Sequence, residues 1–129
     1  MNADEFYQKL RPEDVDFTKK IVKAIKENHL PVFATGGAVC RDDKAYSDID
    51  LVVDSNFTHQ DFIHRGIEEI ASILGAQVRK IGTTHIRELS YSGSAVENRY
   101  CIEKDNTVID LVASPQPFGV IDDLPRVQL

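Results

Sequence analysis

The stretch SDIDLVVD, residues 47–54, decides the fold, and its central IDLV recurs at residues 109–112 inside TVIDLVAS. Side chains alternate between the two faces of a β-strand. In the first copy, Ile49 and Leu51 therefore share one face and Asp48 and Asp50 share the other. Two ionised carboxylates about 5 Å apart repel by roughly 3 kcal/mol at an effective dielectric constant of about 20. The pattern predicts a strand with an apolar inner face and a pair of acids that needs positive charge nearby.

The second copy predicts a strand that presents one further acid. Ile109 and Leu111 share a face, which turns Asp110 to the other one. If the two strands are neighbours in the sheet, three carboxylates converge. Such a cluster of oxygen ligands suits a hard cation such as Mg²⁺, which shares its coordination with substrate phosphates. Asp48, Asp50 and Asp110 are therefore candidate metal ligands, and a solvated strand edge is the alternative interpretation.

Further elements follow from periodicity and from turn residues. Apolar residues at helical spacing predict helices over residues 11–29 and 58–76, with Pro12 in the first turn of one and Gly75 ending the other. Strand-forming residues between turns predict strands at residues 32–35, 49–53, 77–81 and 85–91, and a hairpin of residues 98–103 with 107–113.

This order of elements predicts an α+β fold, with a mixed β-sheet and helices packed on one side. Residues 1–114 are expected to form the domain. Residues 115–129 contain three prolines and little periodicity, so we expect an irregular C-terminal tail that either packs on the domain or awaits a partner.

A glycine pair, Gly36 and Gly37, follows the apolar strand at residues 32–35. Glycine frees the backbone for a tight turn, and exposed backbone N–H groups at such a turn can bind phosphate. Together with SDIDLVV and the later VIDLV, the stretch TGGAVCRD resembles the polymerase β-like nucleotidyltransferase superfamily over residues 32–113. GGAVCRD is also similar to the head domain of CCA-adding enzymes and bacterial poly(A) polymerases.

The resemblance implies a nucleotidyltransferase-like palm and a role for each matched residue. Asp48 and Asp50 would bind the catalytic metals, and Asp110 would complete the site and help to activate the attacking hydroxyl. Gly36 and Gly37 would face the triphosphate of ATP or another nucleoside triphosphate. Two Mg²⁺ ions can stabilise both the attacking and the leaving oxygen of an in-line displacement at phosphorus.

Two further residues are candidates for nucleotide binding. The guanidinium of Arg41 suits the oxygens of a γ-phosphate, although a surface ion pair with the acids that follow it is an equal alternative. Many members of the superfamily carry serine where this chain has Gly37, and Ser47 or Thr35 is a candidate to supply that hydroxyl. The cations considered as balance for the acids are Lys44, Arg79, Lys80 and Arg87, with solvated surface as the alternative.

Composition narrows the class of protein. The chain has 129 residues, 42% hydrophobic content and a net charge of −6, which suits one globular domain and disfavours nucleic acid as a partner. Its two cysteines suit a cytoplasmic protein, and we expect no membrane insertion. Because so small a domain encloses no large cleft, a homo-oligomer or, as the resemblance implies, a helical partner protein is expected to complete the site.

These features predict a Mg²⁺-dependent nucleotidyltransferase that transfers a nucleoside monophosphate, AMP from ATP, to a hydroxyl of a protein or small-molecule acceptor and releases pyrophosphate. One alternative is a catalytically silent nucleotide-binding or interaction module, with the tail as a docking strand. Another is the head fragment of a tRNA-type nucleotidyltransferase.

Overall fold

The computed structural model describes the backbone of residues 1–40, 46, 48–55, 60–89, 93–114 and 125–129, and the side chains of the same ranges except 60, 83–89 and 93–97. In chain order the elements are α1 (Ala3–Lys9), α2 (Pro12–Glu27), β1 (Val32–Thr35), α3 (Gly37–Cys40), β2 (Ile49–Asp54), α4 (Gln60–Ile73), β3 (Gln77–Leu89), β4 (Gly93–Lys104), β5 (Thr107–Ser114) and β6 (Val127–Gln128).

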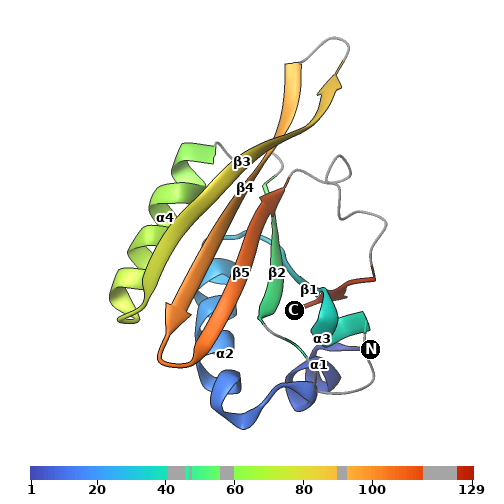
Figure 1. Cartoon of the computed structure of the whole chain (residues 1–129), viewed down its shortest axis with the longest axis vertical. Helices are drawn as coiled ribbons and strands as arrows, with labels where there is room; N and C mark the ends of the chain where they lie inside the picture. Colours follow the sequence, from blue (N-terminus) through green and yellow to red (C-terminus); the bar gives the residue numbers. More distant parts are fainter. Residues whose placement is uncertain (41–45, 47, 56–59, 90–92, 115–124) are drawn as a thin grey trace.

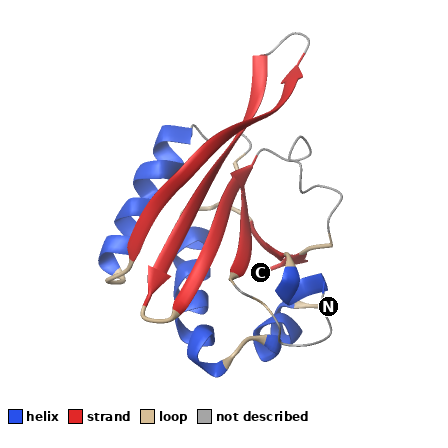
Figure 2. Cartoon of the chain, viewed as in Figure 1, coloured by secondary structure: helices blue, strands red, loops and turns tan. Residues whose placement is uncertain are grey.

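The described strands form one six-stranded sheet in the order β3-β4-β5-β2-β1-β6 (Figures 1 and 2). The pair β2–β5 is parallel, and the other neighbouring pairs are antiparallel. Helices α2 and α4 pack together on one face, behind the sheet in Figure 1, while α1 and α3 lie near its β1–β6 end. The predicted α+β class with a mixed sheet is confirmed.

The two IDLV copies form the centre of the core because their apolar residues face α2 and α4. Ile49, Leu51, Ile109 and Leu111 are each at most 1% exposed and belong to one apolar cluster. From the helices, that cluster includes Phe17, Ile21, Ile25, Ile63 and Ile67. Burying each such side chain stabilises the fold by about 1.5–3 kcal/mol. The acids of both copies are therefore turned to the opposite face of the sheet.

Several local expectations hold and others need correction. Strand Val32–Thr35 is confirmed, as are the helix that starts at Pro12 and the hairpin of β4 and β5. The expectation of two separate strands at residues 77–81 and 85–91 is wrong, because β3 is continuous. Two register shifts against β4 interrupt its pairing instead. Such bulges disturb the alternation that the sequence pattern relies on.

Two short helices, α1 and α3, have no counterpart among the elements expected from the sequence. A capping box stabilises α1, in which the Asn2 side chain accepts from the Glu5 N–H and the Glu5 side chain accepts from the Asn2 N–H. Phe6 and Leu10 then anchor it in the core. Among the residues that the structure describes, no helix combines the length and the apolar character needed to cross a membrane.

The last residues of the chain add a strand to the sheet. Val127–Gln128, within the segment expected to be irregular, forms β6 and pairs with β1. Val127 is buried, and the Thr35 hydroxyl donates to the Pro125 carbonyl at 2.9 Å. Residues 125–129 therefore pack on the domain. The expectation of irregular structure is wrong for Val127 and Gln128, which form a strand.

Candidate metal centre

Asp48, Asp50 and Asp110 come together on the face of the sheet opposite to α2 and α4. In the register of the parallel pair β2–β5, Asp50 lies directly beside Asp110. Asp48 immediately precedes β2, and a strand places residues two apart on the same face. One carboxylate oxygen from each of the three residues lies within 4.8 Å of the other two, and all three side chains are partly buried. The expected convergence of the three carboxylates is therefore present.

Asp50 carries the electrostatic strain of this cluster. Burial is the main cause that raises its pKa, and the negative charges of Asp48 and Asp110 raise it further. Arg99 acts in the other direction, and the pKa of Asp50 lies at about 6 instead of 3.8. This carboxyl group resists ionisation because it is buried and because two further acids place an excess of negative charge beside it. A bound cation would relieve that excess.

Arg99 is the site residue that the sequence analysis missed. It comes from β4, and its Nη2 lies 2.9 Å from Oδ2 of Asp110. The other oxygen of Asp110, Oδ1, is buried without a hydrogen-bond partner among the described residues. A signal was available, because Tyr100 and Ile102 are apolar core positions and alternation turns Arg99 to the acidic face. What the sequence left open is whether the predicted hairpin of β4 and β5 lies beside β2, which brings Arg99 close to all three acids.

Gly36 makes room for the carboxylate of Asp50. Its φ is +75°, in the left-handed region, and a Cβ built on it would lie 2.0 Å from Oδ2 of Asp50. Both facts favour glycine, since an L side chain there would be strained and would collide with the acid. The contact that the structure shows for Gly36 is thus with a candidate metal ligand, and its expected contact with a triphosphate stays a prediction.

The remaining residues expected at the nucleotide are placed only in part. Gly37 begins α3, directly after the turn at Gly36. Arg41 and Ser47 lie outside the described residues. The Thr35 hydroxyl, considered as a replacement for the serine that many members of the resembled superfamily carry, donates to the Pro125 carbonyl instead.

The cations proposed to balance the acids are also only partly described. Arg79 forms an exposed ion pair with Glu103 at 3.5 Å, and Lys80 is exposed. Lys44 and the side chain of Arg87 lie outside the described residues. Arg99, by contrast, does contact the acid cluster, through its ion pair with Asp110.

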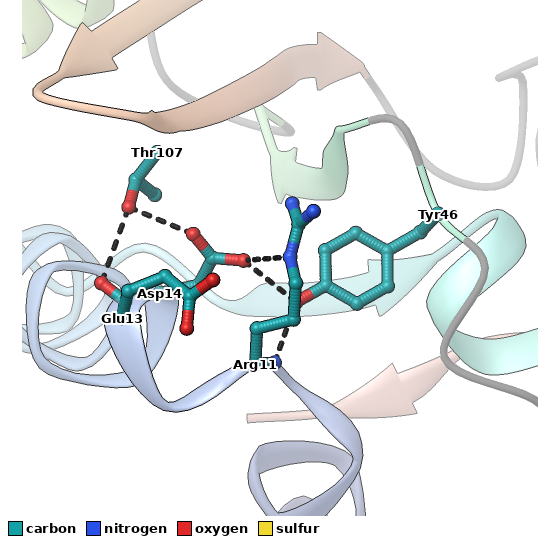
Figure 3. Close-up of polar contacts among 5 residues, drawn as sticks. All are labelled: Arg11, Glu13, Asp14, Tyr46 and Thr107. Carbon is teal, nitrogen blue, oxygen red and sulfur yellow. Dashed lines mark hydrogen bonds and ion pairs between the residues drawn. The ribbon is translucent and has the colours of Figure 1, made fainter.

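A buried polar network holds the two acid-bearing strands at their starting ends (Figure 3). The carboxylate of Asp14, in the first turn of α2, accepts hydrogen bonds from the Tyr46 hydroxyl at 2.6 Å, the Thr107 hydroxyl at 2.8 Å and Arg11 Nε at 3.0 Å. The Tyr46 hydroxyl in turn accepts from the backbone N–H of Arg11 at 2.7 Å. Tyr46 precedes β2 and Thr107 opens β5, so the network positions the starts of both strands.

The hydrogen bonds of this network decide the ionisation of Asp14. Burial alone would raise its pKa, but the bonds from Tyr46, Thr107 and Arg11 together lower the pKa below its ordinary value. Asp14 is therefore a buried carboxylate that stays ionised because its partners satisfy it. By linkage, the stability it contributes is present above the pKa of the unfolded chain and is lost as pH falls through the pKa of the folded state.

Replacing Tyr46 by phenylalanine should lower the free energy of unfolding by about 1.5–2 kcal/mol, because a buried ionised carboxylate loses one donor. Chemical denaturation at neutral pH measures the change. Tyr7→Phe is the matched control, since Tyr7 is partly buried and its hydroxyl makes no hydrogen bond among the described residues. Equal effects of the two substitutions would show that the network does not stabilise the fold.

The donor set at the acid cluster fits a hard divalent cation. The cluster offers carboxylate oxygens close enough to share one ion, and such oxygens are preferred ligands of Mg²⁺. Oδ1 of Asp110 is buried without a partner among the described residues, and the pKa of Asp50 is raised by burial and by its acidic neighbours. Asp48, Asp50 and Asp110 are therefore suited to hold Mg²⁺.

Comparisons with known proteins do not assign the chain to a family. No family model matches it, and no curated protein matches it either. The resemblance to nucleotidyltransferases thus depends on the quoted sequence motifs.

Proposed function

We propose that this chain is a Mg²⁺-dependent nucleotidyltransferase of the polymerase β-like superfamily, which transfers AMP from ATP to a hydroxyl acceptor. The observation that carries the proposal is the meeting of Asp48, Asp50 and Asp110 within 4.8 Å beside the turn at Gly36. Two aspartates on one strand would be weak support for a metal site. Here a third acid, Asp110, comes from a distant segment and pairs in register with Asp50, and three such carboxylates suit the two metal ions of phosphoryl transfer.

Each acid has a role in this proposal. Asp48 and Asp50 would hold the metal ions on β2, and Asp110 would complete the site from β5. Bound Mg²⁺ would stabilise the negative charge that develops on the phosphate oxygens during the transfer. The turn at Gly36 and Gly37 would face the triphosphate, and the contact of Gly36 with Asp50 keeps turn and ligand in a fixed relation.

The reaction conserves atoms and charge through one displacement. The acceptor oxygen forms a bond to the α-phosphorus of ATP while the bond from that phosphorus to the bridging oxygen breaks. Pyrophosphate leaves, and the hydroxyl proton passes to a carboxylate oxygen of Asp110. Because the hydroxyl must reach both the phosphorus and Asp110, the acceptor approaches from the β5 side of the cluster.

The acceptor class follows from charge and size. A net charge of −6 repels a long polyanion, so we propose a protein or small-molecule acceptor. A second copy of the chain or a helical partner protein would complete the cleft. Two cysteines that form no disulfide suit work in the cytoplasm.

Thermal unfolding with ATP, in the presence and absence of Mg²⁺, tests the proposal. Ligand at about 100 times its Kd adds about 2.7 kcal/mol to the stability of the folded state, so the parent should gain several degrees only when ATP and Mg²⁺ are both present. Asp48→Asn, Asp50→Asn and Asp110→Asn should each lose that gain. Asp105→Asn makes the same chemical change at an exposed turn and should keep it.

Turnover is tested separately by incubating labelled ATP with the protein and a lysate, and by measuring pyrophosphate. Label on a protein or a small molecule identifies the acceptor class. Stabilisation by ATP and Mg²⁺ without pyrophosphate release would support a silent nucleotide-binding module instead. Absence of stabilisation in the parent would sink the transferase proposal.

A further inference from the structure

The residues of the site follow the order of the strands across one face of the sheet. Gly36 directly follows β1, Asp50 lies on β2, Asp110 on β5 and Arg99 on β4, and these four strands are successive neighbours. Arg99 therefore stands at the end of the row that is farthest from the glycine turn. Its ion pair joins it to the acid cluster through Asp110.

The two members of this ion pair differ in burial. The side chain of Asp110 is 14% exposed, whereas that of Arg99 is 48% exposed. Asp110 is thus held by its strand and its buried surroundings, and the guanidinium reaches it from the open side through one nitrogen, Nη2. This asymmetry argues that Asp110 keeps its position by itself and that Arg99 contributes mainly its charge.

A positive charge in this place has opposite effects on two kinds of ligand. It repels a free divalent cation that approaches the acids, and even at water-like dielectric such repulsion amounts to about a tenfold loss of affinity. It attracts a metal–nucleotide complex, whose triphosphate makes the complex negative overall. Outer partners that orient a metal ligand and raise its basicity strengthen metal binding, but a cationic partner draws electron density away from the carboxylate and weakens it.

We propose that Arg99 is the internal counter-cation of the acid cluster, and that it couples tight metal binding to the arrival of the anionic nucleotide. Before metal arrives, Arg99 balances part of the charge of the three acids, which keeps their carboxylates close together. A free metal ion must then bind against the charge of Arg99. A metal ion with its triphosphate binds with the help of that charge. This inference rests on the proposed function, because it assumes that the cluster takes metal and nucleotide.

The test compares Arg99→Gln and Arg99→Lys with the parent at fixed ionic strength. Binding of Mn²⁺, used as a spectroscopic probe, is measured alone and with a non-hydrolysable ATP analogue. We expect Arg99→Gln to bind free Mn²⁺ about five- to tenfold more tightly and the Mn²⁺–analogue complex about tenfold more weakly. Arg99→Lys keeps the charge and should lie near the parent in both measurements.

Arg79→Gln is the matched control. It removes the same charge from the neighbouring strand, where Arg79 pairs with Glu103 outside the acid cluster. Both affinities should stay within about twofold of the parent, because exposed charges at a distance are screened. Circular dichroism of the metal-free variants checks that each one is folded.

Because Arg99→Gln is expected to strengthen binding of free Mn²⁺ and to weaken binding of the Mn²⁺–analogue complex, the possible outcomes can be told apart. If Arg99→Gln weakens both kinds of binding, Arg99 holds Asp110 in place and the counter-cation role is wrong. If it changes neither while the parent binds both ligands, the inference fails and the proposed function stands. If the parent binds neither Mn²⁺ nor the analogue, the proposed function and the inference fail together.

Discussion

Asp50→Asn should abolish Mg²⁺-dependent ATP binding and at the same time make the metal-free protein more stable by about 1–2 kcal/mol. Asparagine keeps the shape of the side chain but removes the charge that burial and the two neighbouring acids oppose. The rise of its pKa from 3.8 to about 6 means that ionised Asp50 destabilises the folded state by about 3 kcal/mol at most. Partial exposure and screening reduce the gain that we expect.

The pH dependence has a definite sign. Between about pH 4 and about pH 6, folded Asp50 holds a proton that the unfolded chain has released. Stability from this group therefore falls as pH rises through that window, and the loss is complete above it. Asp50→Asn should remove this decline. Denaturant titrations of the parent and the variant from pH 4 to pH 7.5 measure it.

Asp110→Asn is the matched comparison, because it removes the neighbouring acid in register with Asp50. It also removes the ion pair with Arg99, so we expect a smaller gain or a loss of stability. Both variants should lose at least about a hundredfold in any metal-dependent turnover. Equal stability gains at the two positions would contradict the assignment of the electrostatic strain to Asp50.

Gly36→Ala should cost about 3 kcal/mol of stability, the second large effect. One part is the left-handed φ of +75°, which costs a non-glycine residue about 1–2 kcal/mol. The other is the collision of the new Cβ with the Asp50 side chain, at 2.0 Å from Oδ2 and 2.7 Å from Cγ, for which overpacking costs of about 1–3 kcal/mol are typical. Chemical denaturation measures the sum.

A double-mutant cycle separates the two parts. Asp50→Ala removes the two nearest atoms, so Gly36→Ala should cost about 1–2 kcal/mol less in that background. Gly66→Ala is the control, since Gly66 lies within α4 and a Cβ there would meet no atom within 4 Å. It should stabilise the protein by about 0.5–1 kcal/mol. A strictly additive cycle would show that Gly36 and Asp50 do not compete for the same space.

Local patterns predicted most of the central elements. Alternation identified β2 and β5 and the face on which each acid lies, and the glycine after β1 marked the turn that Asp50 now contacts. Prediction failed where the signal is weak or distorted. Bulges in β3 break its alternation, and α3 has four residues, too few to show helical periodicity.

Some features of the site follow from local sequence, and others follow from contacts between distant segments. That Asp48, Asp50 and Asp110 face away from Ile49 and Leu111 is determined by the sequence itself, because alternation is a property of each strand alone. That Asp50 and Asp110 stand in register was decided by the tertiary structure, whereas the predicted hairpin of β4 and β5 already placed Arg99 on the strand next to Asp110. The parallel pairing of β2 with β5 depends on the long connection through α4, β3 and β4 and on burial against α2, contacts between residues far apart in the chain that no local pattern encodes.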